Sequence, residues 1–268
     1  MPRSPLMEVM TRAVIKASRG LRRDYGEVTH LQVSKKGTAD FVSNADVNAE
    51  RVLQKELQHA RPKFGFLMEE GGEIAGEDDR HRWIIDPIDG TSNFIHAVPY
   101  FCISVALERT SSIGEREIIA AVIYDPLRDE LFTAEKASGA FLNDRRIKVS
   151  GRRDVEDALL STALPRSFRD NYKPALSMMT GMTGSSAGIR CFGAAALDLA
   201  YVATGRFDGF WSNSLKPWDI AAGMLLVKEA GGEVTEIAGG KKMLDSGSIV
   251  ATNGVLHKKV DALLSEFA

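Results

Sequence analysis

Two aspartates separated by a tight turn are the residues of this sequence best suited to chemistry. Asp86 and Asp89 follow the apolar segment Trp83-Ile84-Ile85, which is typical of a buried strand that Asp86-Pro87 should end. Two carboxylates fixed at the end of a core strand can share a hard cation, with the carbonyl oxygen between them as a further ligand. Asp-Pro and Asp-Gly are also ordinary turn dipeptides, so the spacing alone leaves a purely structural interpretation open.

Other carboxylates occupy similar positions at the ends of predicted elements. Glu69 and Glu70 come directly after the apolar segment 64–68, which predicts a strand, and the glycine-rich acidic segment 71–79 predicts a loop. Asp219 lies at the start of a nearly all-apolar helix that Pro217 should begin. A helix cap would be a sufficient explanation of Asp219 by itself.

The four carboxylates Glu69, Asp86, Asp89 and Asp219 would repel one another strongly if they converged without cations. An all-oxygen set without a His or Cys cluster favours Mg²⁺ over Zn²⁺. Nucleophilic catalysis has less support, because neither cysteine has a base nearby in the sequence and the five histidines are scattered.

The elements that must position these residues differ between two portions of the chain. Residues 1–149 predict helices followed by an antiparallel sheet, whereas residues 150–268 alternate between strand and helix patterns, as in an α/β unit. No linker separates the portions, so we expect one compact catalytic unit with two subdomains. The predicted helices are 5–25, one opening at Ser43 with Asp46 as capping-box partner, 168–180, 194–204, one from 217, and 255–267. The predicted strands are 31–34, 64–68, 83–85, 100–108, 118–124, 130–133, a hairpin over 139–148, 158–163, 188–192, 207–211, 233–237 and 248–252.

The composition limits the classes of partner. The chain has 268 residues, 34 Lys plus Arg against 36 Asp plus Glu, and a net charge of −2, which gives no general attraction to nucleic acid or anionic membrane. The local basic clusters 145–148 and 152–153 are interpreted as solvated surface. The only two cysteines, Cys102 and Cys191, are expected to be buried free thiols. No apolar run is long enough to span a membrane, and no signal-peptide core is present, so a cytoplasmic protein is expected.

Three segments together resemble the inositol monophosphatase family of Mg²⁺-dependent, lithium-sensitive sugar phosphatases. They are Glu69-Glu70, Asp86-Pro87-Ile88-Asp89-Gly90-Thr91-Ser92-Asn93-Phe94 and Trp218-Asp219-Ile220-Ala221-Ala222-Gly223. The resemblance covers nearly the whole chain. It implies a layered α-β-α-β-α sandwich, usually a homodimer, and a small phosphorylated polyol as substrate.

The resemblance also implies roles for individual residues and two or three Mg²⁺ ions per site. Glu69, Asp86 and the Ile88 carbonyl would bind the first ion; Asp86, Asp89 and Asp219 would bind the second; Glu69 would help to hold a third through water. Thr91, paired with Asp46, would orient and deprotonate the attacking water, with Glu69 nearby. Gly90 and Thr91 would hold phosphate, and Asp219 would contribute to binding the substrate. Gly193, Ala194 and Ala195 would line the side of the substrate alcohol, and Lys35 or Lys36 would lie on a mobile loop over the site.

One position departs from the family pattern. Members acting on inositol phosphate usually have a glutamate seven residues before the aspartate of Trp218-Asp219, where this chain has Ser212. The polyol contact would then be lost or replaced by Asn213, which predicts a weaker or broader substrate preference. Fructose 1,6-bisphosphate, a nucleotide 3′-phosphate and histidinol phosphate are therefore alternative substrates. A regulatory binding module with a relic site is a second alternative, although a relic would have no reason to keep every ligand; a Ca²⁺ or Mg²⁺ storage protein is disfavoured because no ligand loop is repeated.

Overall fold

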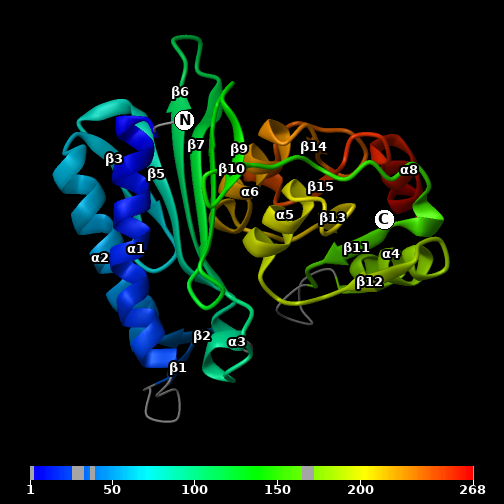
Figure 1. The fold of residues 1–268 in the computed structure, drawn as a ribbon, viewed down its shortest axis with the longest axis horizontal. Coiled ribbons are helices and arrows are strands. Elements are labelled where there is room, and N and C mark those ends of the chain that lie inside the picture. Colours follow the sequence, from blue (N-terminus) through cyan, green and yellow to red (C-terminus); the bar gives the residue numbers. More distant parts are fainter. Residues whose placement is uncertain (1–2, 26–32, 37–39, 165–171, 268) are drawn as a thin grey trace.

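Two sheets alternate with three layers of helices in this protein (Figure 1). The computed structural model describes residues 3–25, 33–36, 40–164 and 172–267. From one side to the other, the layers are α1 with α2, the larger sheet, α5 with α6, the smaller sheet, and α4 with α8. The predicted layered α-β-α-β-α sandwich is therefore confirmed. Among the described residues, no helix combines the length and the apolar character that crossing a bilayer requires.

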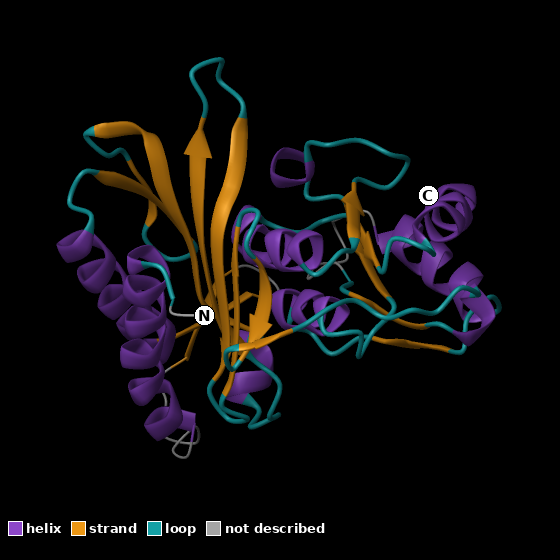
Figure 2. Ribbon diagram, turned by 45° about the horizontal axis from the view of Figure 1, so that its top comes forward, coloured by secondary structure: helices purple, strands orange, loops and turns teal. Residues whose placement is uncertain are grey.

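The larger sheet has eight strands in the order β10-β9-β8-β7-β6-β5-β3-β4. All neighbours are antiparallel except β3 and β5, which are parallel. The strands are β3 (Phe64–Met68), β4 (Gly72–Ile74), β5 (Asp78–Asp89), β6 (Cys102–Thr110), β7 (Arg116–Asp125), β8 (Glu130–Glu135), β9 (Gly139–Leu142) and β10 (Arg145–Arg146). The antiparallel sheet expected for residues 1–149 is present, and the long β6–β7 hairpin projects from it (Figure 2).

Two predictions about this sheet were wrong. Asp86-Pro87 does not end the strand, because β5 continues to Asp89 through a shift of register against β6. Proline has no backbone N–H to donate to a neighbouring strand. Where the register shifts, the strand can include Pro87 without losing a regular hydrogen bond of the ladder. The acidic segment 71–79 is not all loop either, because it contains β4 and the start of β5.

The outer face of the larger sheet is covered by α1 (Pro5–Tyr25) and α2 (Asn44–Ala60). Apolar residues at helical spacing, including Met10, Val14 and Leu21 of α1, pack in one core with Trp83 and Ile85 of β5. The helix predicted to open at Ser43 begins at Asn44. A separate hairpin of β1 (Val33–Lys36) and β2 (Asp40–Ser43) precedes it.

The smaller sheet has the order β12-β11-β13-β15-β14. Strand β11 is parallel to β12 and β13, and the other pairs are antiparallel, which agrees with the α/β character expected for residues 150–268. Helices α4 and α8 cover its outer face. The elements of this half are a 3₁₀ turn (Val155–Asp157), β11 (Leu159–Thr162), α4 (Tyr172–Thr183), β12 (Gly188–Arg190), β13 (Gly209–Ser212), β14 (Glu233–Thr235), α7 (Met243–Ser246), β15 (Ile249–Thr252) and α8 (His257–Phe267). The first residues of the helix predicted over 168–180 lie outside the described residues.

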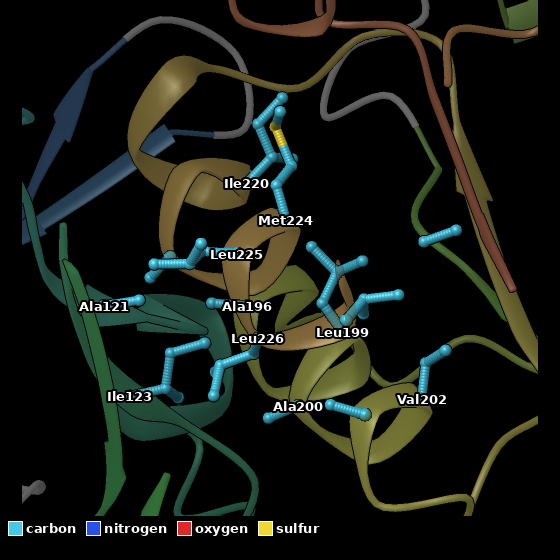
Figure 3. Packing of buried hydrophobic residues seen from close by; sticks show 14 of the residues in the cluster. Ala121, Ile123, Ala196, Leu199, Ala200, Val202, Ile220, Met224, Leu225 and Leu226 are labelled. Carbon is cyan, nitrogen blue, oxygen red and sulfur yellow. The ribbon is translucent and has the colours of Figure 1, made fainter. Parts of the chain in front are cut away.

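Helices α5 (Ala195–Ala203) and α6 (Pro217–Glu229) fill the space between the sheets. Figure 3 shows Leu199 of α5 beside Met224 and Leu226 of α6, with Ile123 of β7 across from them. The contact is close, since a methyl group added at Gly223 would come within 2.5 Å of the Leu199 side chain. The two helices therefore carry their N-terminal ends as fixed parts of the core.

Candidate metal centre

The end of β5 places two carboxylates in the interior of the protein. Asp86 and Asp89 are 0% and 3% exposed, although neither belongs to an apolar residue type. The chain then turns at Gly90, whose φ of 97° favours glycine. A side chain at Gly90 would also approach the Tyr100 carbonyl oxygen to 3.0 Å, so the limited space favours glycine here as well as the conformation.

The start of α6 brings a third carboxylate to the same place. Asp219 is 5% exposed, and its Oδ2 accepts a 2.8 Å hydrogen bond from the backbone N–H of Lys216, the residue that caps the start of the helix. Asp219 is thus a helix cap, as one interpretation of the sequence held. Asp219 also forms an acidic cluster with Asp86 and Asp89, because one carboxylate oxygen of each of the three residues lies within 4.8 Å of the others.

The electrostatics of this cluster are unfavourable without a cation. Burial raises the pKa of Asp86 well above its usual range, and the charges of Glu69, Asp89 and Asp219 raise it further. Neither oxygen of Asp86 has a hydrogen-bond partner among the described residues. A hard divalent cation would satisfy these oxygens and remove the repulsion, so the donor set fits the magnesium that the sequence suggested.

Glu69 lies beside the cluster, directly after the end of the neighbouring strand β3. Its backbone N–H donates to the Ile85 carbonyl at 3.3 Å, which places it next to Asp86. Its charge acts on two buried groups, because it raises the pKa of both Asp86 and Asp46. The four carboxylates singled out in the sequence therefore occupy one region of the fold.

Thr91 and Asp46 also meet, from α3 (Thr91–Ile95) and α2. A hydrogen bond joins their side chains and lowers the pKa of Asp46, but burial and the charges of Glu69 and Glu70 raise it by more. The Thr91 hydroxyl donates to the Ile88 carbonyl oxygen at 2.9 Å. This hydroxyl therefore contacts the backbone between the two aspartates on one side and Asp46 on the other.

The N-terminus of α5 contacts Asp89 through a backbone amide. The Ala196 N–H donates to Asp89 Oδ2 at 2.6 Å, and the Cys102 thiol lies 3.8 Å from the same oxygen. Amides in the first turn of a helix have no partner within it, and a carboxylate there also interacts favourably with the helix dipole.

The residues predicted on the substrate side have different surroundings. Gly193 is exposed with φ of 81°, whereas Ala194 and Ala195 are buried at the start of α5. Ser212 is 2% exposed, and its hydroxyl donates to the Ala163 carbonyl oxygen at 3.0 Å. The neighbouring Asn213 has a buried Oδ1 with no hydrogen-bond partner among the described residues.

The predicted basic loop differs from the structure in part. Lys35 and Lys36 belong to strand β1 and pair with Phe41 and Asp40 of β2, so their backbone does not form a loop. Residues 37–39, which complete the predicted loop, lie outside the described residues.

Three features near the centre were missed or mispredicted from the sequence. Glu50 is 6% exposed and accepts a 2.9 Å hydrogen bond from the Glu70 N–H; its position four residues after Asp46 on one helix could have indicated it. Asp198 is fully buried in helix α5. A single acidic residue in an otherwise apolar helix could have indicated a buried polar contact. Cys102 is buried as expected, but the prediction for Cys191 was wrong, because it lies exposed beyond the end of the edge strand β12.

Comparison with known proteins identifies the family of this chain. The sequence model of the inositol monophosphatase family matches residues 3–267. An inositol-1-monophosphatase of Rhizobium meliloti is 54% identical over 258 residues, covering 96% of this chain and 95% of that protein. A Pseudomonas aeruginosa protein named Nus factor SuhB is 43% identical, covering 93% and 92%. The structure of the extragenic suppressor protein suhB of Bartonella henselae superimposes with a TM-score of 0.93 at 51% identity, covering 98% and 99%. On this full-length match, the chain belongs to the inositol monophosphatase family.

Proposed function

We propose that this protein is a Mg²⁺-dependent phosphomonoesterase that hydrolyses inositol 1-phosphate or a related sugar or polyol phosphate. The observation that carries the proposal is the buried cluster of Asp86, Asp89 and Asp219, in which both Asp86 oxygens lack a hydrogen-bond partner among the described residues. Membership of the family and relatives named inositol-1-monophosphatase support the same activity.

Specific residues would hold the ions and the reacting groups. Glu69, Asp86 and the Ile88 carbonyl would bind one ion, and Asp86, Asp89 and Asp219 a second, with Glu69 helping to hold a third through water. Bound Mg²⁺ would neutralise phosphate oxygens, favour the deprotonation of water and stabilise the leaving alkoxide in an in-line displacement. The short distances among the three aspartate oxygens support shared coordination of this kind.

The residues around the ions would orient the reactants. Thr91, bonded to Asp46, would orient the attacking water and take up its proton, with Glu69 nearby. Gly90 and Thr91 would hold the phosphate, and Gly193 at the start of α5 would line the side of the substrate alcohol. With water activated by the metal, no covalent phosphoenzyme is needed. Cys102 would also be a poor nucleophile, because it is fully buried against Asp89 and desolvation raises its pKa. The proposal includes sensitivity to Li⁺ and a homodimer, which rest on the family resemblance, and a cytoplasmic location, which rests on the sequence.

The decisive experiment is phosphate release from a panel of inositol, fructose, nucleotide and histidinol phosphates, with Mg²⁺ and with excess EDTA. We expect metal-dependent release, led by inositol 1-phosphate or another polyol phosphate. Release led by a different phosphate would keep the mechanism and change the substrate. No release from any of them by folded protein in saturating Mg²⁺ would contradict the proposal.

A regulatory binding role is the second candidate, because several relatives are named Nus factor SuhB. The net charge of −2 gives this chain no general attraction to nucleic acid, which favours a protein partner for any such role. Replacing Asp89 by Asn separates the two functions. A cell phenotype that survives loss of turnover would support regulation, and one that is lost together with turnover would support the enzyme alone.

A further inference from the structure

A buried tyrosine–aspartate pair connects the larger sheet to helix α5 next to the metal centre. The Tyr100 hydroxyl donates to Asp198 Oδ1 at 2.5 Å. Tyr100 is 6% exposed and Asp198 is 0% exposed, so solvent does not compete for this hydrogen bond. No role proposed above for the phosphatase reaction uses either side chain.

The two ends of this bridge lie close to a proposed metal ligand in the fold. Tyr100 precedes β6 by two residues, and Cys102 at the start of β6 is paired with Asp89 across the sheet. Asp198 lies in the first turn of α5, two residues after Ala196, whose N–H donates to Asp89 Oδ2. The bridge therefore joins the strand beside Asp89 to the helix whose amide holds Asp89.

A second bridge fixes the segment that leads into α5. The Asn93 side-chain amide donates to the Tyr100 carbonyl at 2.8 Å and to the Phe192 carbonyl at 2.7 Å. The Tyr100 and Phe192 rings also pack with their centroids 4.7 Å apart. Asn93 thus holds the backbone before the helix, and the Tyr100–Asp198 hydrogen bond adds a contact to the first turn of the helix itself.

We propose that Tyr100 and Asp198 are positioning residues for the metal centre, which keep the Ala196 amide aimed at Asp89. The inference rests on the proposed function insofar as Asp89 is taken to bind Mg²⁺. Carboxylate ligands of metals are themselves oriented by hydrogen bonds, and loss of such outer contacts typically weakens metal affinity by about 10–100-fold. The Tyr100–Asp198 bond acts one contact further out, so a loss of about 3–10-fold is expected.

The test is titration calorimetry of Mg²⁺ into the full-length protein without substrate. Tyr100→Phe removes the hydroxyl and keeps the ring, and should raise the Kd for Mg²⁺ by about 3–10-fold. Asp198→Asn keeps Oδ1 as an acceptor for the Tyr100 hydroxyl and should bind within about twofold of the unmodified protein. The kcat of Tyr100→Phe at saturating Mg²⁺ should stay within about twofold, because the ligands themselves are unchanged.

Tyr124→Phe is the control, because the Tyr124 hydroxyl donates to Asp129 at 2.6 Å in a tyrosine–aspartate pair on the outer face of the sheet, where the Asp129 side chain is exposed. It should bind Mg²⁺ like the unmodified protein. An unchanged Kd for Tyr100→Phe would overturn the inference, and so would an equal loss in Asp198→Asn, which would show that charge and not the hydrogen bond matters. Failure of the unmodified protein to bind Mg²⁺ would instead overturn the proposed function.

Discussion

The backbone N–H of Ala196 donates a 2.6 Å hydrogen bond to Asp89 Oδ2, although the two residues are 107 positions apart in the sequence. This bond connects the helix layer between the sheets to the end of β5. Asp89 thereby belongs both to the acidic cluster and to the N-terminus of α5. The position of the Asp89 carboxylate therefore depends on how the helices between the two sheets pack.

Replacing Asp89 by Asn should separate activity from stability. Asparagine Oδ1 can still accept the Ala196 N–H, but one of the several charges that raise the pKa of the buried Asp86 is lost. We expect kcat/KM to fall by more than about 100-fold, because loss of a metal ligand should weaken activity more than loss of a residue that only hydrogen-bonds a ligand. In EDTA, relief of repulsion should raise the Tm by about 2–4 °C, equivalent to about 1 kcal/mol.

The control for this variant is Asp79→Asn, which removes one exposed carboxylate from the start of the same strand. It should change neither turnover nor Tm. Turnover of Asp89→Asn equal to that of the unmodified protein would contradict the role of Asp89 as a metal ligand.

Removal of divalent metal should destabilise the folded protein. An ion that binds the folded cluster and not the unfolded chain raises the free energy of unfolding by about 2.7 kcal/mol at 100 times its Kd. The Tm measured by calorimetry should therefore rise with Mg²⁺ concentration and fall on addition of EDTA. Asp86→Asn should abolish this dependence, since Asp86 lies in the cluster with no other partner among the described residues. An equal Mg²⁺ response in Asp86→Asn would place the ion elsewhere.

The sequence predicted the parts of the site that depend on local pattern. The tight turn at Gly90, the strand before Glu69 and the helix begun by Pro217 form as expected, because turn residues and apolar runs specify them locally. Parallel pairing of β3 with β5 then brings Glu69 beside Asp86. The predicted strand end at Asp86-Pro87 was wrong because tertiary pairing with β6 extends the strand past a residue that local propensity excludes.

Contacts between distant segments could not be predicted in this way. Nothing in the pattern around Asp198 points to Tyr100, since the two meet only when α5 packs against β6. The exposure of Cys191 likewise depends on β12 being an edge strand, and strand order is not encoded locally.

The Thr91 hydroxyl should affect turnover even when Mg²⁺ is saturating. Its contacts are the Ile88 carbonyl oxygen and Asp46. Thr91→Ala should lower kcat at saturating Mg²⁺ by about 10²–10⁴-fold, the usual contribution of a positioned proton acceptor. The Kd for Mg²⁺ should also rise, by about 10–100-fold, because the Ile88 carbonyl that this hydroxyl contacts is a proposed metal ligand. Thr91→Ser keeps the hydroxyl and should retain kcat within about tenfold. A kcat for Thr91→Ala close to that of Thr91→Ser would exclude Thr91 from handling the proton of the attacking water.

His257 should make the stability of the fold depend on pH near neutrality. Burial lowers its pKa, although Glu233 and Asp261 act in the opposite direction. Its Nδ1 lies 3.1 Å from Thr252 Oγ1 and its Nε2 lies 3.0 Å from Thr235 Oγ1. The Thr235 hydroxyl donates to a backbone carbonyl and the Thr252 hydroxyl accepts from a backbone N–H, an arrangement that suits a neutral ring with its hydrogen on Nε2.

Because the folded pKa of His257 is below the unfolded one, the unfolded chain takes up the proton first as the pH falls below about 6.5. The free energy of unfolding should then decrease between pH 7 and pH 5.5 by about 1 kcal/mol more in the unmodified protein than in His257→Gln. Urea unfolding at the two pH values measures this difference. His59→Gln, at an exposed position, is the control and should behave like the unmodified protein. Parallel pH curves for His257→Gln and the unmodified protein would contradict the assignment.

Ser212 should contribute little to substrate binding, because its hydroxyl is already used inside the fold. It is 2% exposed and donates to the Ala163 carbonyl oxygen at 3.0 Å, which ties the end of β13 to the end of β11. Ser212→Ala should lower the free energy of unfolding by about 1 kcal/mol, the net value of one hydrogen bond. Its KM for inositol 1-phosphate should change by less than about twofold. A tenfold rise in that KM would show that the hydroxyl turns to the substrate. Asn213→Ala distinguishes the remaining possibilities: a higher KM with unchanged kcat means that Asn213 replaces the missing polyol contact, and an unchanged KM means that this contact is absent, as the expected broader substrate preference requires.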